Sequence, residues 1–367
     1  MTAAWGPDIL GPDFEQHTLE LDDGAVATLV RYAGTGPRHE DSPIDPAVGA
    51  DVLYVHGWSD YFFQEHLARF WHQLGATFYA VDLRNYGRSL RPGQIQGAVS
   101  GLEIYDEEIN AALAAMGRTE GSTRPLILLG HSTGGLTLSL WAHRNPGKAT
   151  ALILNSPWLE FQATEIGRLA LAPLVGIGAR LHPLVPLPAV DSGNYTRAVS
   201  SAMDGEWDYN PQWRPVRGFP LTPSFLDAVF RGQALVAGKL AIDVPVLVML
   251  SDKSYLQPRW SVDAQHSDVA LNVEAVAHRA LSLGHTVTVL RIPDAFHDIF
   301  LSPAPIRNQA FAGMTRWLPS ALPTPGSGHP GSNHRQRWSV KDLLARAQSW
   351  KYSILAPMVF RRSARSS

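Results

Sequence analysis

The chain has 367 residues, of which 45% are apolar and 17% charged, and its formal net charge is −2. This length and composition predict a globular protein with a sizeable core, built as one large domain with additions or as two domains. The near-neutral charge gives no indication of a nucleic-acid partner. The absence of cysteine excludes disulfides and thiolate metal sites.

The N-terminus, MTAAWGPDIL, lacks the basic region and the long apolar region of a signal peptide. The longest apolar stretch, LALAPLVGIGA at residues 169–179, contains proline and glycine and is too short to span a bilayer. We therefore expect a cytoplasmic protein.

Short apolar runs alternate with helical patterns along most of the chain. We expect strands at 14–22, 25–32, 51–55, 76–81, 125–129, 150–154, 246–250 and 286–292, and helices at 61–74, 102–116, 136–143, 273–283 and 306–318. The first two strands flank DDG, which predicts a hairpin. The alternation after them predicts an α/β fold with a mostly parallel sheet flanked by helices.

Residues 158–242 interrupt this alternation and are rich in leucine, proline and tryptophan. We interpret them as a cap inserted into an α/β core made of residues 1–157 and 243–318. The apolar residues at 169–187 are expected mostly to pack within the cap's own core, with some facing a substrate crevice. Three tryptophans are candidates for lining that crevice: Trp158, Trp207 and Trp213.

Two further segments follow the core. Residues 319–334, PSALPTPGSGHPGSNH, have the composition of a linker. Residues 335–367 carry eight arginines and lysines and one acidic residue, so this tail is basic and the rest of the chain is acidic.

The motif ILLGHSTGG, at residues 127–135, joins an expected buried strand to an expected helix. A turn this sharp crowds the positions two residues before and after its apex, and here both are glycines, Gly130 and Gly134. This is the G-x-S-x-G elbow, which lifts the hydroxyl of Ser132 above the carboxyl edge of a sheet. The sequence therefore predicts a nucleophilic serine.

A serine hydroxyl needs a base that accepts its proton. His297, in RIPDAFHDIF, follows the expected strand at 286–292 and so lies at the same sheet edge. We expect His297 to be that base.

Two residues are candidates for the acid that orients the base. Asp252 directly follows the strand at 246–250, where such an acid normally lies, but it precedes His297 by 45 residues. Asp268 precedes His297 by 29 residues, which is enough for one loop, one helix and one strand. We favour Asp268, with residues 255–267 as an insertion before it, and keep Asp252 as the alternative. Asp298 adjoins His297, and neighbouring side chains usually diverge.

Stabilising an oxyanion requires two N–H donors. Thr133 follows the serine at the start of a helix, and Trp58 follows His56 and Gly57 at the end of the strand at 51–55. We expect the N–H groups of Trp58 and Thr133 to form this oxyanion hole. His56 is expected to have a structural role, hydrogen-bonded within its own loop.

The motifs VHGWSDY, DLRNYGRS, GHSTGG and AFHD occur here in this order. Over residues 14–318 the chain resembles the α/β-hydrolase superfamily, and within it the monoacylglycerol lipase and lysophospholipase group, also called the serine aminopeptidase-like hydrolases. The resemblance implies hydrolysis of an acyl ester through an acyl-enzyme, without a cofactor. The apolar residues expected to face the crevice favour an apolar acyl group in that ester. It implies that Ser132 is the nucleophile and His297 the base, with Trp58 and Thr133 as oxyanion donors. The expanded loop before Asp268 departs from the family pattern.

The motifs do not separate ester hydrolysis from other reactions of the same triad. A thioesterase, an amidase or a carbon–carbon hydrolase would use the same triad, because these reactions differ only in the leaving group. A non-catalytic, hydrolase-like binding protein is the alternative from another class, and such proteins usually lose the nucleophile or the base. Dehalogenases and epoxide hydrolases of the superfamily have an aspartate where Ser132 stands.

The basic tail suggests a further partner. Residues 340–360 mix aromatic and aliphatic side chains with cations, a composition that suits a membrane interface. Two interpretations of residues 335–367 remain open: peripheral contact with an anionic membrane, or a basic helix that docks on the acidic core.

Overall fold

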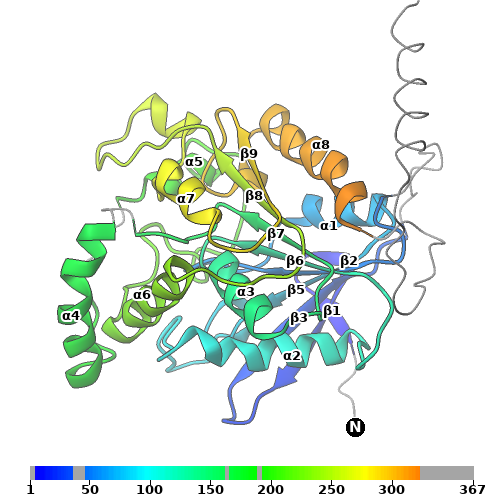
Figure 1. Ribbon diagram of the computed structural model, residues 1–367, viewed down its shortest axis with the longest axis horizontal. Helices are drawn as coiled ribbons and strands as arrows, with labels where there is room; N and C mark the ends of the chain where they lie inside the picture. The colour runs from blue at the N-terminus through cyan, green and yellow to red at the C-terminus, as the bar shows by residue number, and fades with distance from the viewer. Residues whose placement is uncertain (1–4, 36–45, 162–164, 188–191, 323–367) are drawn as a thin grey trace, which may run out of the picture. The chain divides into compact units, whose positions relative to one another are not determined.

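The computed structural model describes residues 5–35, 46–161, 165–187 and 192–322 (Figure 1). Within these residues one nine-stranded sheet has the order β1-β2-β3-β5-β4-β6-β7-β8-β9. The strands are β1 (Gly6–Asp8), β2 (Gly11–Glu20), β3 (Val26–Tyr32), β4 (Asp51–Val55), β5 (Thr77–Asp82), β6 (Leu126–His131), β7 (Ala151–Asn155), β8 (Val246–Ser251) and β9 (Val287–Ile292).

The sheet confirms the predicted α/β architecture. β1, β2 and β3 pair antiparallel, with β2 and β3 forming the predicted hairpin, and β3 joins β5 antiparallel. The other strands, from β5 across to β9, are parallel. Only β1 has no counterpart among the predicted strands.

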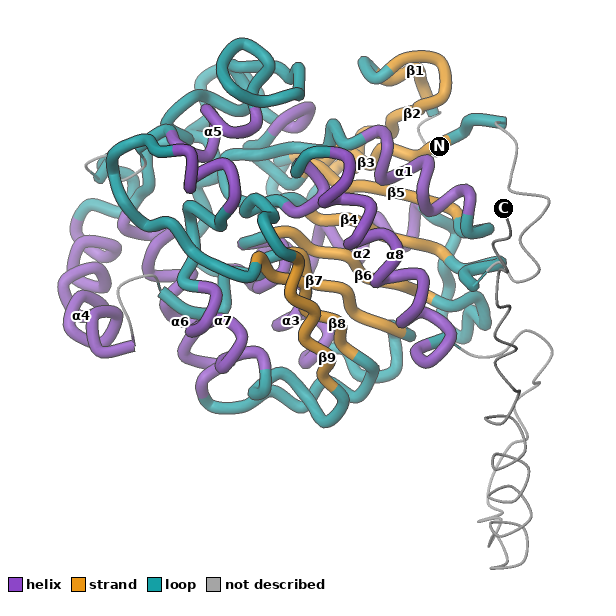
Figure 2. Tube along the Cα trace, turned by 90° about the horizontal axis from the view of Figure 1, so that it is seen from above, coloured by secondary structure: helices purple, strands orange, loops and turns teal. Residues whose placement is uncertain are grey.

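Five helices of the described core cover the two faces of the sheet (Figure 2). They are α1 (Glu65–Gln73), α2 (Tyr105–Ala115), α3 (Thr133–Arg144), α7 (Val273–Ala280) and α8 (Ala304–Ala321). Buried side chains of α1 and α8 share one hydrophobic cluster, and those of α2, α3 and α7 share the other. The sheet is thus the middle layer of three.

Alternation along the strands divides the core. In β4, Leu53 and Val55 belong to the cluster under α2 and α3, whereas Val52 and Tyr54 belong to the cluster under α1 and α8. Successive strand side chains point to opposite faces, so a strand buried on both faces is apolar throughout. This explains why the parallel strands were readable as continuous apolar runs.

Several predicted boundaries differ from the structure by a few residues, and two of these differences have a clear consequence. The helix predicted from residue 61 begins only at Glu65, because side-chain oxygens bind the preceding backbone N–H groups: Asp60 that of Tyr61, and Asp82 that of Phe62. At the other end of the core, α8 continues through Pro319 to Ala321, so residues 319–321 of the predicted linker are helical. Pro319 has no N–H to donate to the helical ladder. Residues 323–334 of the predicted linker lie outside the described residues. The predicted tail, 335–367, lies outside the described residues.

The interval predicted as a cap contains three helices among its described residues: α4 (Glu165–Leu181), α5 (Asn194–Val199) and α6 (Pro223–Ala237). α6 packs on α3 of the core, and α4 packs on α6 at the edge of the molecule (Figure 1).

The expectation that the apolar residues of α4 mostly pack inside the cap is wrong. Leu174 and Leu181 are 67% and 68% exposed. Leu169, Leu171 and Ile177 are also exposed. Among the described residues, one layer of helix on helix leaves the outer face of α4 without a partner.

The turn from β6 into α3 is tightly packed. Ser132 lies at its apex with φ of 51° and ψ of −115°, a strained conformation for a residue with a side chain. A Cβ on Gly130 would lie 2.7 Å from the carbonyl oxygen of Gly134, and one on Gly134 would lie 2.4 Å from the carbonyl oxygens of Val55 and His56. The crowding predicted on both sides of the serine is therefore present, and all the contacts that cause it are to backbone atoms.

We expect Gly134→Ala to lower the free energy of unfolding by at least about 2 kcal/mol, because backbone on β4 and its loop cannot move aside as a flexible side chain can. Urea unfolding followed by circular dichroism measures this. Gly6→Ala is the control, since a Cβ on Gly6 meets no atom within 4 Å. Equal stability of the two variants would contradict the packing account.

Candidate active site

The carboxyl ends of the parallel strands gather the predicted residues at one sheet edge. Ser132 follows β6, His297 follows β9 by a short loop, and Asp268 lies in the loop between β8 and α7. Parallel strands all end at the same edge, so residues far apart in the sequence can meet there.

Ser132 and His297 are hydrogen-bonded. The Nε2 atom of His297 lies 3.1 Å from Oγ of Ser132. Both side chains are nearly enclosed, with Ser132 9% and His297 4% exposed. A neutral imidazole next to a serine hydroxyl in this way can accept its proton.

The carboxylate that meets His297 is Asp268. Its Oδ2 atom lies 2.9 Å from Nδ1 of His297, and its Oδ1 accepts the N–H groups of Ala270 and Leu271, each at 2.8 Å. Asp268 is completely buried. These two backbone bonds orient the carboxylate, which in turn holds the imidazole with its proton on Nδ1.

The alternative acid, Asp252, is not at the imidazole. Its side chain is exposed, and Oδ1 accepts the N–H of Asp294 at 3.1 Å, which closes the turn after β9. The chain leaves β8, makes an excursion and returns, because the N–H of Asp268 donates to the carbonyl of Lys253 and the carbonyl of Asp268 accepts from Tyr255. The segment between them therefore loops out as an insertion, and the acid lies beside the strand end although it is far along the sequence.

The proposed oxyanion donors flank the serine. Thr133 opens α3, so its N–H precedes the intrahelical ladder. Trp58 follows Gly57, where a Cβ would come within 2.9 Å of Cβ of Ser132. In the described part of the chain no carbonyl or side chain accepts the N–H of Trp58 or Thr133. The glycine thus brings the backbone of the β4 loop against the serine.

The structural role expected for His56 is confirmed by its bonds. Its Nε2 accepts the N–H of Leu83 at 3.1 Å, which leaves the proton on Nδ1 to be donated to the carbonyl of Gly57 at 2.8 Å. Burial lowers the pKa of His56, in keeping with a neutral ring.

Asn155, at the end of β7, ties the serine turn to the histidine loop. Its carbonyl accepts the N–H of Ser132 at 3.0 Å. Its side chain donates to Oδ1 of Asp298 at 2.7 Å and accepts the N–H of Ile299 at 3.2 Å. We did not predict this residue, although a polar residue ending the apolar run ALILN, on the strand next to β6, was a usable signal.

Asp298 is buried in this framework and not directed at the imidazole. Its Oδ1 also accepts the N–H of Phe300 at 3.0 Å, and its Oδ2 accepts the side-chain amide of Gln64 at 3.0 Å. Adjacent to His297 in sequence, it holds the loop, in line with the expectation that neighbouring side chains diverge.

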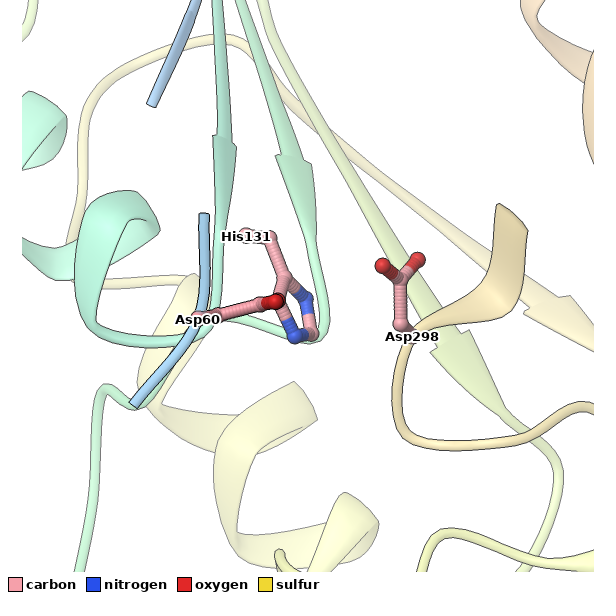
Figure 3. A group of neighbouring side chains, drawn as sticks. All are labelled: Asp60, His131 and Asp298. Atoms are coloured by element: carbon pink, nitrogen blue, oxygen red, sulfur yellow. The ribbon is translucent and has the colours of Figure 1, made fainter. Parts of the chain in front are cut away.

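Asp60, His131 and Asp298 form a buried group whose polar atoms lie within 4.8 Å of one another (Figure 3). Burial raises the pKa of Asp60 to about 7, which Arg214 opposes, and burial lowers the pKa of His131 to about 4. Three N–H donors already surround Asp298, and Asp60 pairs with Arg214. These donors would repel a cation, so the group fits a hydrogen-bonded cluster better than a metal site.

The tryptophans expected to line a crevice have other partners. Trp158 is buried, and its backbone N–H donates to the carbonyl of Ser132 at 3.0 Å. Trp207 stacks on His66 and donates to the carbonyl of Leu301, and Trp213 packs against Tyr61. Trp158 supports the serine turn through its backbone, and the other two hold residues 207–213 against the core.

Residues 46–303 match the family model described as Serine aminopeptidase, S33 (Hydrolase_4), a span that includes Ser132, Asp268 and His297. Two curated relatives are similar over most of their length. Monoacylglycerol lipase of Mycolicibacterium smegmatis is 25% identical over 279 residues, covering 74% of this chain and 88% of the relative. Phospholipase YtpA of Bacillus subtilis is 26% identical over 266 residues, covering 69% of this chain and 96% of the relative.

Solved structures show the same fold. A soluble variant of monoglyceride lipase from Saccharomyces cerevisiae matches with a TM-score of 0.60 at 17% identity, covering 88% of this chain and all of that one. Monoacylglycerol lipase of Paleococcus ferrophilus matches with a TM-score of 0.55 at 19% identity, covering 75% and 97%. The chain therefore belongs to the serine aminopeptidase S33 (Hydrolase_4) family and is an α/β-hydrolase.

Proposed function

We propose that this protein is a serine hydrolase that cleaves carboxylic esters with an apolar acyl group, through an acyl-enzyme on Ser132. The observation that carries the proposal is the unbroken hydrogen-bonded chain from Oγ of Ser132 through His297 to Asp268. The lipase and phospholipase relatives support ester hydrolysis over the thioester, amide and carbon–carbon alternatives.

The reaction follows from these positions. Oγ of Ser132 attacks the ester carbonyl while Nε2 of His297 takes the hydroxyl proton. The imidazolium keeps its Nδ1–H on Asp268, whose charge stabilises it. The same Nε2–H then protonates the leaving alcohol, and a water molecule repeats the sequence on the acyl-enzyme.

The negative charge of each tetrahedral intermediate lies between the N–H groups of Trp58 and Thr133. The N-terminus of α3 adds its favourable dipole there. Gly57 matters for this step, because only a residue without Cβ lets the β4 loop approach the serine closely enough.

The substrate class we propose is a lipid ester. The curated relatives are a monoacylglycerol lipase and a phospholipase. The exposed apolar side chains of α4 provide a surface on which an acyl chain or its aggregate can rest.

We also propose that the basic tail, 335–367, brings the enzyme to anionic membrane. Its composition, cations among aromatic and aliphatic residues, supports this. Among the helices of the described ranges, none is both long and apolar enough to cross a bilayer.

Ser132→Ala should abolish detectable turnover of p-nitrophenyl esters, since at most about 10³–10⁴-fold acceleration over water remains without the nucleophile. Covalent labelling by a fluorophosphonate should disappear with it, while the thermal melt stays that of the wild type. Ordinary turnover by this variant would refute the nucleophile assignment.

Asp268→Asn should lower kcat by about 10⁴-fold, because an amide cannot hold the proton on Nδ1 and stabilise the imidazolium. Asp252→Asn is the matched control and should leave kcat within about twofold, since Asp252 only closes a surface turn. Steady-state kinetics on one ester decide between them; the reverse order of effects would restore Asp252 as the acid.

Removal of residues 335–367 should abolish co-flotation with vesicles that contain anionic lipid and leave hydrolysis of a water-soluble short-chain ester unchanged. The tail carries the basic charge, whereas the described site lies in residues 56–298. Equal flotation of the full and shortened chains would end the membrane proposal.

A further inference from the structure

Three consecutive side chains of the core each hold one polar group of the cap. They are Ser59, Asp60 and Tyr61, which directly follow Trp58 in the β4 loop. The pairs are Ser59 Oγ with the N–H of Phe219 at 2.9 Å, Asp60 Oδ1 with Nε of Arg214 at 3.2 Å, and Tyr61 OH with the N–H of Asn210 at 2.8 Å. The cap segment 210–219 is thus bound to the chain immediately after a proposed oxyanion donor.

Arg214 is the charged member of this set and is enclosed on several sides. Arg214 and Asp60 both have 3% of their side chain exposed. The guanidinium lies 4.6 Å from the ring centroids of both Tyr195 and Tyr209, and 5.9 Å from that of Phe63. A planar cation held against aromatic faces and a carboxylate has little freedom to move.

The residues in contact with Arg214 adjoin both His297 and the loop of Trp58. The ring of Tyr195, on α5, meets the ring of His297 edge-on at 5.4 Å between centroids. On the other side, Asp60 lies two residues after Trp58, whose indole packs on Phe225 of α6 at 3.9 Å. One cap arginine therefore touches a neighbour of the base and a neighbour of the oxyanion donor.

We propose that Arg214 is a positioning residue that couples docking of the cap to assembly of the active site. Through Asp60 it holds the loop that presents the N–H of Trp58, and through Tyr195 it supports the ring of His297. Only when segment 210–219 is packed against the β4 loop are the N–H of Trp58 and the ring of His297 both in place.

This inference rests on the roles proposed above for Ser132 and His297. It is carried by the contacts of Arg214 with Asp60, Tyr195 and Tyr209.

The test compares Arg214→Met with Arg217→Met. Both arginines lie on segment 210–219, but Arg217 is exposed. Asp60 can take up a proton when its cation is removed, because burial already raises its pKa to about 7 while Arg214 lowers it, so Arg214→Met leaves no unpaired buried charge. Kinetics of p-nitrophenyl butyrate hydrolysis and the rate of fluorophosphonate labelling are measured for wild type and each variant.

We expect Arg214→Met to lower kcat and the labelling rate about 10–100-fold with KM changed less than about threefold, since loss of one oxyanion donor alone costs about 10²–10³-fold. Arg217→Met should match the wild type. Arg214→Lys keeps the charge but not the planar stack and should recover part of kcat. Adding Asp60→Asn to Arg214→Met should lower kcat no further, because both act through one contact.

Three results would overturn the inference: wild-type kcat for Arg214→Met, a change confined to KM, or a loss of kcat that equals the unfolded fraction in the thermal melt. If Arg214→Met does not fold, Arg214→Lys carries the same comparison. Failure of the proposed function looks different, since the wild type would then be inactive or Ser132→Ala active. Ser132-dependent activity with an unaffected Arg214→Met removes only this inference.

Discussion

The close approach of three backbone segments at Ser132 is the constraint on which the rest of the molecule depends. A Cβ on Gly134 would clash with the carbonyl oxygens of Val55 and His56 at 2.4 Å. A Cβ on Gly130 would clash with the carbonyl oxygen of Gly134 at 2.7 Å. Because β4, β6 and the start of α3 are in such close contact, the serine is forced to positive φ and its hydroxyl projects above the sheet edge. The same closeness places the loop of Trp58 against it.

The strained turn can serve the proposed chemistry only if His297 lies within hydrogen-bond distance of Ser132. The end of β7, the strand next to β6, helps to position His297. Asn155 bonds the serine turn with its backbone and the histidine loop with its side chain. The loop therefore follows any shift of the turn. Asp298 and Gln64 extend this network to the start of α1, so buried amide and carboxylate groups help to set the position of His297.

The interval predicted as a cap contributes charge as well as apolar surface. Arg214 and Asp60 are both buried, and separating them would leave a buried charge without its partner, which is costly. The ion pair therefore holds segment 210–219 against the β4 loop. The outer face of α4, by contrast, has exposed leucines and no partner among the described residues, which fits a surface that meets lipid.

Periodicity and motif spacing were enough to predict the parallel sheet, its hairpin and the positions of Ser132, His297 and Asp268, because strand ends and glycine-flanked turns are local properties of the chain. The spacing argument also led to Asp268, which lies beside the imidazole while Asp252 does not. The buried contacts of Asp60, Arg214 and Tyr195 were decided only by tertiary structure. Arg214 and Tyr195 lie in an interval without a regular period, and Asp60 meets Arg214 far along the chain, so these contacts cannot be read from the sequence. The exposed face of α4 was missed for the same reason: an apolar helix predicts burial, and only the arrangement of neighbouring helices decides which face is covered.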